Sequence, residues 1–207
     1  MHRTFAPALI ALAALAAGPA AAETRALSGF DGVAVRDRIE VEVATGQSFR
    51  VEVSGPDAAR VRTRVEDGTL DISRANRSWF GNNGRIDATV RVTAPAIDSL
   101  AAARGAEIRA TGIRADDMSL AAAMGGDIRI DGSCRTLDAA VSMGGMVRAD
   151  EFQCEDADIA ASMGGEARVY ASRRFEAAAS MGGAVNVAGG GARGDVATSM
   201  GGLVSQN

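Results

Sequence analysis

The stretch "ASMGGEARV" (161–169) contains a motif that recurs along the second half of this chain. Each copy of the motif has one central residue. Counting Arg104 of "AARGA" as the first, successive central residues are separated by 20, 19, 20, 18 and 19 residues. A period near 19 with strand-like alternation predicts a β-solenoid whose regular coils occupy residues 100–207. The five Met-Gly-Gly copies are "AAMGG" (122–126), "VSMGG" (141–145), "ASMGG" (161–165), "ASMGG" (179–183) and "TSMGG" (198–202).

The parity of the apolar residues predicts which side chains face the core. Leu120, Ala122, Met124, Gly126 and Ile128 share one parity, and the alternate positions are polar or tiny. If that parity continues through the Gly-Gly, each coil is two short strands joined at a bend, with serine outward and methionine inward. Gly-Gly would then turn a corner that bulkier residues could not, and the stacked methionines would fill the space inside it.

The methionine column also raises the alternative of a soft-metal site for Cu(I). Such a site needs sulfur atoms that are accessible and convergent. The parity favours a buried ladder instead, so we expect no metal or other cofactor.

The first half of the chain predicts short strands between Leu27 and Pro95. Apolar and charged residues alternate there, and Asp67-Gly68 stands between two alternating runs, which is a hairpin signature. The segment "NRSWFGNNGR" (76–85) is predicted to be a loop, because its Asn and Gly residues favour positive φ. We find no helical periodicity here.

The N-terminus predicts export. Residues 1–22 combine a basic start, an apolar run and small residues before Glu23, which is typical of a secretory signal peptide cleaved after Ala22. No later apolar stretch is long enough to span a membrane as a helix. We therefore expect residues 23–207 to form a single domain, located in the periplasm or secreted.

Composition excludes several classes of chemistry. The chain contains no lysine, and its one histidine, His2, lies in the leader. A mature chain of this kind cannot form a Ser-His-Asp triad, a His-ligated zinc site or a Schiff base. Its net charge is −4 and its arginines are scattered, so nucleic acid is not an expected partner.

The two cysteines test the alignment of the coils. Cys134 lies 10 residues after Met124, and Cys154 lies 11 after Met143. They would therefore occupy nearly equivalent positions in adjacent coils, at a Cα separation of roughly 5 Å. In an exported chain this predicts a Cys134–Cys154 disulfide.

Markers along the first half carry a family resemblance. The opening "GFDGV" (29–33), the turn "VEDGTLDI" (65–72) and the strand "VTAP" (92–95), followed by Gly-rich coils, resemble the bacterial family called putative auto-transporter adhesin, head GIN domain. The resemblance implies an exported, single-stranded, right-handed parallel β-helix of unestablished biochemical role. The chain departs from the family in using "SMGG" where other members show a plainer Ser-Gly-x-Gly.

An arginine column is the candidate ligand surface. Its four arginines occupy the same position in successive repeats and have the outward-facing parity. Stacked guanidinium groups could bind an anionic glycan or another envelope component. The alternative is a solvated face whose opposite charges neutralise each other. Trp79 and Tyr170 are the candidate platforms for stacking a sugar ring. The column consists of Arg109, Arg129, Arg148 and Arg168.

Together these features predict an exported, non-catalytic structural or adhesive protein of the cell envelope. The alternative is a polysaccharide lyase or glycosidase that uses a pair of carboxylates. The sequence stops directly after the coil that contains "TSMGG", so we also expect self-association through an uncovered last coil.

Overall fold

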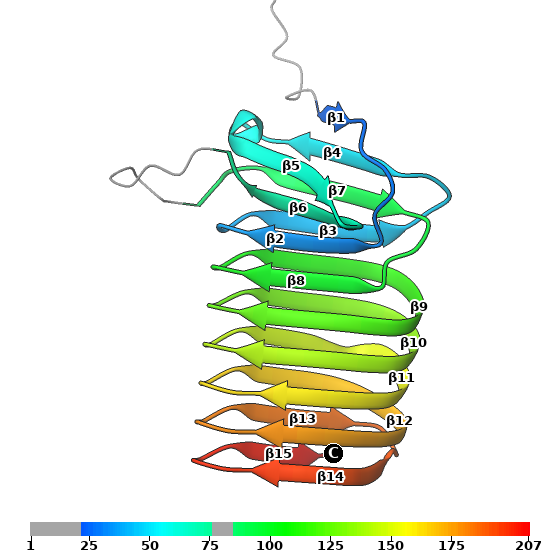
Figure 1. Ribbon diagram of the computed structural model, residues 1–207, viewed down its shortest axis with the longest axis vertical. Coiled ribbons are helices and arrows are strands. Elements are labelled where there is room, and N and C mark those ends of the chain that lie inside the picture. Colours follow the sequence, from blue (N-terminus) through cyan, green and yellow to red (C-terminus); the bar gives the residue numbers. More distant parts are fainter. Residues whose placement is uncertain (1–21, 76–84) are drawn as a thin grey trace, which may run out of the picture.

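The computed structural model describes residues 22–75 and 85–207, and the described chain is a stack of β-coils. Figure 1 shows the coils piled along one axis, with the N-terminal strands at one end and the C-terminus at the other. The predicted β-solenoid is therefore confirmed. Residues 1–21 of the predicted signal peptide lie outside the described residues, and so does Trp79.

The strands are short in the first half and long in the second. The N-terminal elements are β1 (Glu23–Arg25), β2 (Gly32–Arg36), β3 (Glu40–Thr45), β4 (Arg50–Ser54), the 3₁₀ turn η1 (Ala58–Arg60), β5 (Val61–Glu66), β6 (Thr69–Arg74) and β7 (Thr89–Ala94). The coil elements are β8 (Ser99–Ala103), β9 (Glu107–Ala123), β10 (Asp127–Ser142), β11 (Met146–Ala161), β12 (Glu166–Ala179), β13 (Ala184–Ala188), β14 (Ala192–Thr198) and β15 (Leu203–Gln206).

Each long strand bends to serve two faces of the solenoid. The first part of β9 pairs in parallel with β3, and its last part pairs in parallel with β8. The strands β10, β11 and β12 follow in parallel register, so Asp127 stands between Glu107 and Met146. The register shifts fall at the bend inside the strands, away from the Met-Gly-Gly corners. Differences in coil length are thus absorbed at the bend.

Antiparallel strands cover the N-terminal end of the stack. The strand β4 lies antiparallel between β1 and β7, and β5 pairs antiparallel with β6. The β5–β6 turn is Asp67-Gly68, with φ of 47° and 76°, which confirms the predicted hairpin. Positive φ at both central residues is the type I′ geometry that matches the twist of paired strands.

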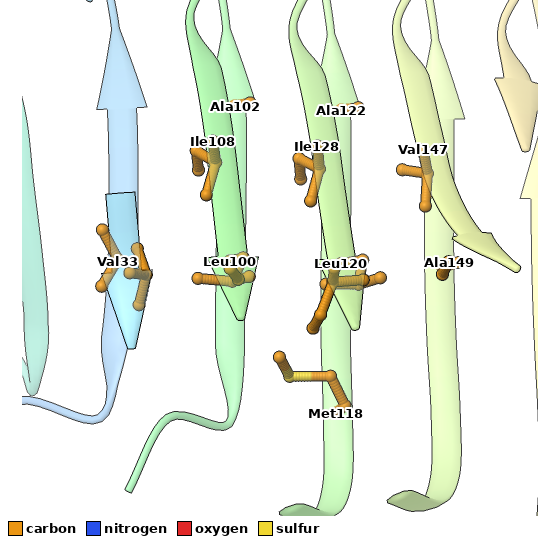
Figure 2. Close-up of a cluster of buried hydrophobic side chains, with 14 of the residues drawn as sticks. Val33, Leu100, Ala102, Ile108, Met118, Leu120, Ala122, Ile128, Val147 and Ala149 are labelled. Atoms are coloured by element: carbon orange, nitrogen blue, oxygen red, sulfur yellow. The ribbon is translucent and has the colours of Figure 1, made fainter. Parts of the chain in front are cut away.

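The core is a set of aliphatic columns that run along the axis. Figure 2 shows Ile108, Ile128 and Val147 on one face and Leu100 and Leu120 on the other, all pointing into the interior. Their exposed fractions are 1% or less. Parallel register places each side chain directly over its equivalent in the next coil, so every added coil buries another apolar layer.

The Met-Gly-Gly corners correct one prediction. Met124, Met143, Met163 and Met181 are each 47% exposed, so the methionines point outward and not inward. The methionine and the first glycine both have positive φ, and the N–H of the second glycine donates to the carbonyl three residues earlier. This is a type I′ turn, and alternation of facing holds only while the backbone is extended. Residues flanking the turn, such as Ala122 and Ile128, are buried as predicted.

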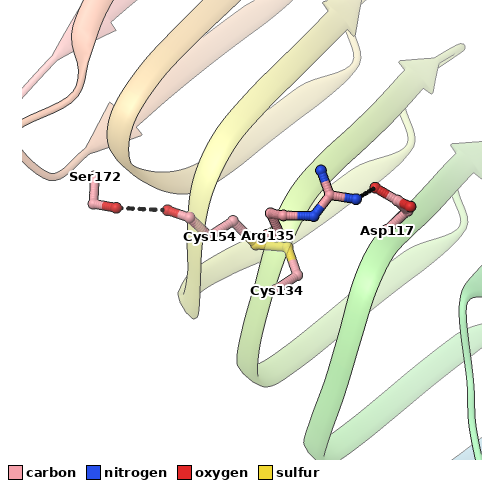
Figure 3. Close-up of a disulfide and its surroundings, with 5 residues drawn as sticks. All are labelled: Asp117, Cys134, Arg135, Cys154 and Ser172. Atoms are coloured by element: carbon pink, nitrogen blue, oxygen red, sulfur yellow. Dashed lines mark hydrogen bonds and ion pairs between the residues drawn. A yellow bond between two sulfur atoms is a disulfide. The ribbon is translucent and has the colours of Figure 1, made fainter.

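The predicted disulfide is present between adjacent coils. Cys134 of β10 pairs in register with Cys154 of β11, with Cα atoms 4.5 Å apart. Figure 3 shows the bond joining the two strands at their bends, beside the Arg135–Asp117 ion pair of 2.8 Å. The bond therefore links consecutive coils at the corner where their lengths vary.

Candidate functional site

Four arginines stand in one column on an outward face of the coils. Arg129 of β10 pairs in register with Arg109 of β9 and with Arg148 of β11, and Arg148 pairs with Arg168 of β12. Neighbouring equivalent residues in a sheet are about 4.8 Å apart. The structure thus brings together the four arginines that the repeat predicted.

A column of carboxylates runs beside the arginines, two residues earlier in the strands. Arg109 lies 2.7 Å from Glu107, and Arg168 lies 2.8 Å from Glu166. Arg109 also contacts Glu40 of β3 at 3.1 Å. The outer arginines of the column are therefore neutralised within their own coil or by the coil above.

The middle of the column is different, because β11 places Met146 where its neighbours place a carboxylate. Arg148 reaches back to Asp127 of the preceding coil at 2.8 Å. Arg129 lies 4.0 Å from the same Asp127. Two guanidinium groups thus share one carboxylate of the neighbouring column.

A shallow hollow of about 340 Å³ lies beside these residues. Its lining carries both signs of charge, from Arg109, Arg129 and Arg148 and from Asp131, Asp150 and Glu151. The carboxylate of Asp131 accepts a 2.7 Å hydrogen bond from the backbone N–H of Gly112. Asp131 is therefore already hydrogen-bonded to the bend of the coil above. The hollow can therefore receive a polar chain that carries both hydroxyl and anionic groups.

The arginine side chains remain accessible in spite of their partners. Their exposed fractions are 45% for Arg109, 50% for Arg129, 28% for Arg148 and 53% for Arg168. A guanidinium has five N–H donors in a fixed plane, and one or two contacts to a carboxylate leave the others for a ligand.

The two predicted aromatic platforms do not join this column. Tyr170 lines a separate hollow of about 590 Å³ together with Arg114, Arg135, Cys134 and Cys154, next to the disulfide. Trp79 falls in residues 76–84, which the structure does not describe. A sugar-stacking role for either residue stays a prediction.

Two arginines elsewhere on the surface have raised pKa values. The hydrogen bond that Arg173 donates to Asp156, together with the negative charge of Asp156, raises the pKa of Arg173. The hydrogen bond that Arg91 donates to Glu42 raises the pKa of Arg91. Within the described residues, no group of three or more His, Cys, Asp or Glu side chains could hold a metal ion. No helix in residues 22–75 and 85–207 has the length and hydropathy needed to cross a membrane.

Comparison with solved structures supports the fold. A putative adhesin from Bacteroides fragilis superposes with a TM-score of 0.68 at 14% identity, covering 90% of this chain and 96% of its own. Two proteins from Parabacteroides distasonis, a putative lipid binding protein and a putative adhesin, each give a TM-score of 0.48, at 16% and 15% identity. In both cases the match covers 92% of this chain and 98% of the other.

Comparison at the level of sequence identifies the family. No curated protein matches the chain at a significant level of similarity. The family model for putative auto-transporter adhesin, head GIN domain, matches residues 29–191, which include the arginine column, the disulfide and four of the five Met-Gly-Gly corners. The chain belongs to that family.

Proposed function

We propose that the protein is an exported, non-catalytic binding protein of the bacterial cell envelope, and that its arginine column binds an anionic glycan. The observation that carries this proposal is the in-register column of accessible arginines, in which Arg129 and Arg148 share the single carboxylate of Asp127. The family, described as putative auto-transporter adhesin, head GIN domain, favours a binding role over catalysis.

A repetitive face suits a repetitive ligand. Each coil presents an arginine about 4.8 Å from the next, so a polymer lying along the axis can engage several coils at once. Single exposed ion pairs contribute little, but linked contacts add through effective concentration. Affinity would then come from the length of the bound polymer, without a deep pocket.

Retention on immobilised polygalacturonate tests the proposal, with neutral dextran as the blank matrix. We expect the protein to be retained at low salt and to elute as added salt screens the contacts. Arg129→Ala/Arg148→Ala should elute at clearly lower salt. The matched control is Arg135→Ala/Arg173→Ala, which removes the same charge from arginines paired with Asp117 and Asp156 on another face.

Two outcomes would contradict the glycan proposal. One is that the wild-type protein passes through polygalacturonate as it passes through dextran. The other is an equal shift of both double variants, which would mean that net charge alone controls retention and that the column has no special role.

Self-association through the last coil is a second part of the proposal. Met200 and Leu203 are 74% and 70% exposed there, and Val196 and Val204 are only partly covered by the core. Among the described residues, β15 pairs only with β13 and β14 pairs only with β12, so one edge of each strand has no paired strand. An open strand edge beside apolar side chains favours pairing with a second copy.

Sedimentation over a range of concentrations checks this association. We expect a concentration-dependent dimer that Leu203→Lys abolishes, because a charge at an edge opposes pairing. Ala140→Lys, on an exposed position near the end of β10 and away from the last coil, should leave the dimer unchanged. A monomer at every concentration would contradict the proposal.

Export can be checked directly. We expect the protein in the periplasmic or culture fraction, with Glu23 as its first residue after cleavage at Ala22. Recovery of the intact chain from the cytosol would contradict export.

A further inference from the structure

Five methionines occupy the same exposed corner of successive coils. Four of them are 47% exposed and the last is 74% exposed. All five have positive φ, between 44° and 51°. The column, here called the methionine ladder, consists of Met124, Met143, Met163, Met181 and Met200.

The backbone turn does not demand methionine. Arg104 takes the equivalent position one coil earlier with φ of 56°, and Asp67 takes it in the β5–β6 hairpin with φ of 47°. The left-handed region strains residues with a Cβ, and Gly, Asn and Asp tolerate it best. Methionine is therefore conformationally unfavourable at a position where the fold accepts polar residues.

Burial does not explain the methionines either. Each one leaves about half or more of its residue surface in water, so it gains little from the hydrophobic effect. Met118 of β9 is the contrasting case, because it lies in the core with 2% exposure. What the ladder adds to the surface is a row of accessible thioether groups.

The corners hold these thioethers in register. The N–H of the first glycine donates to the methionine carbonyl of the next coil at 3.2–3.3 Å along the whole stack. Methionine Cα atoms therefore repeat at the coil spacing of about 4.8 Å. With three rotatable side-chain bonds, two or three neighbouring methionines can direct their Sδ atoms to one point.

We propose that the methionine ladder binds a soft monovalent cation, Cu(I) or Ag(I), through its thioether sulfurs. Thioethers select such ions over hard or borderline divalent cations. Both cysteines are held in the disulfide, and the one histidine of the chain is His2, so methionines supply the soft ligands of residues 23–207, and the ladder holds five of those seven methionines. This inference is independent of the glycan proposal and uses a different corner of the coils.

The chemistry gives the site a characteristic pH response. Imidazole and thiolate ligands lose metal when acid protonates them, whereas a thioether does not titrate. Binding at the ladder should therefore persist at pH 5. The sulfur requirement also means that an apolar residue of similar size cannot replace methionine.

The experiment titrates the mature protein, labelled at the methionine methyl carbons, with Ag(I) in nitrate buffer. Silver needs no reductant, so the disulfide stays intact. The methyl resonances of the ladder should shift at pH 7 and at pH 5, and the resonance of Met118 should not. An equal amount of Zn(II) should shift none of them.

Two triple variants test the need for sulfur at Met143, Met163 and Met181. Replacing all three with Leu keeps apolar bulk, and replacing all three with Asn relieves the strained φ and keeps the fold stable. Both should lose Ag(I) binding in calorimetry, whereas Met118→Leu should retain it. Unchanged binding by the folded triple variants, or equal shifts with Zn(II), would overturn the proposal.

Discussion

The two glycines of each Met-Gly-Gly corner are required for different physical reasons. Gly144 has φ of +69° and open space where a Cβ would stand. Gly145 has ordinary φ, but a Cβ there would lie 2.4 Å from the carbonyl oxygen of Ala122 in the coil above. The first glycine supplies a backbone conformation, and the second allows two coils to approach.

This difference predicts unequal effects of the same substitution at neighbouring positions. Gly144→Ala should lower the free energy of unfolding by about 1–2 kcal/mol, because the cost is left-handed strain alone. Gly145→Ala should cost more, about 3 kcal/mol or beyond, because backbone atoms must move apart. Denaturant unfolding of both variants measures the difference, and equal losses would contradict the assignment.

At the scale of elements, the disulfide joins β10 and β11 within a column of small residues. Cys134 pairs in register with Ala115 above, and Cys154 pairs with Ala171 below. Alanine therefore already fills this position in the flanking coils. Replacing both cysteines with alanine extends the same column, so the main loss is the crosslink itself.

We expect Cys134→Ala/Cys154→Ala to lower the free energy of unfolding by about 3 kcal/mol, from the entropy of a loop of this length. The sequence separation of the two cysteines is 20 residues. Wild-type protein unfolded under reducing conditions should match the variant. A stability equal to that of the oxidised wild type would show that the crosslink constrains little.

A carboxylate fastens the 3₁₀ turn η1 to the segment that leads into β7. Asp57 accepts a 3.1 Å hydrogen bond from the backbone N–H of Asp87 and another from Arg60. The Asp87 hydrogen bond, followed by that of Arg60, lowers the pKa of Asp57 below its ordinary value of 3.8. A lowered pKa in the folded state means that the charged form stabilises the protein.

The contribution of Asp57 is therefore present above its unfolded pKa and is lost as the pH falls through the folded value. Asp57→Asn should be less stable than wild type at pH 7, and the two unfolding curves should converge as the pH drops below 3.8. Thermal unfolding measured from pH 7 to pH 2.5 checks this. A constant gap across that range would contradict a role for the charge.

At the scale of the whole molecule, stability should vary along the solenoid axis. Central coils are covered on both sides, whereas Val196 and Val204 of the last coil are only partly covered. In a repeat protein each coil is stabilised by its neighbours, so an end coil opens first.

Native-state hydrogen exchange should therefore rank the strands. Amides of β9, β10 and β11 should exchange slowest, and amides of β14 and β15 fastest. The antiparallel strands β4 and β5 should give the N-terminal end intermediate protection. Equal protection of β10 and β15 would contradict this order.

Several parts of the fold and the site could be read from local pattern. Alternation predicted the burial of Leu120, Ala122 and Ile128, and the repeat period placed Arg109 and Arg129 in one column. The orientation of Met163 could not be read in this way, because alternation fails where φ turns positive. Asp67-Gly68, which has the same turn in a recognisable hairpin, was the signal that could have corrected it.

The sequence by itself determined the period of the regular coils, the alignment of their equivalent positions and the disulfide between adjacent coils, because each follows from a repeat of about 19 residues and strand alternation. The tertiary structure alone decided the rest. Sharing of Asp127 by Arg129 and Arg148 depends on distances between coils. Exposure of the methionines depends on two consecutive residues of positive φ. The hydrophobicity of the side chain opposes this conformation, but the close stacking of coils at the second glycine requires it.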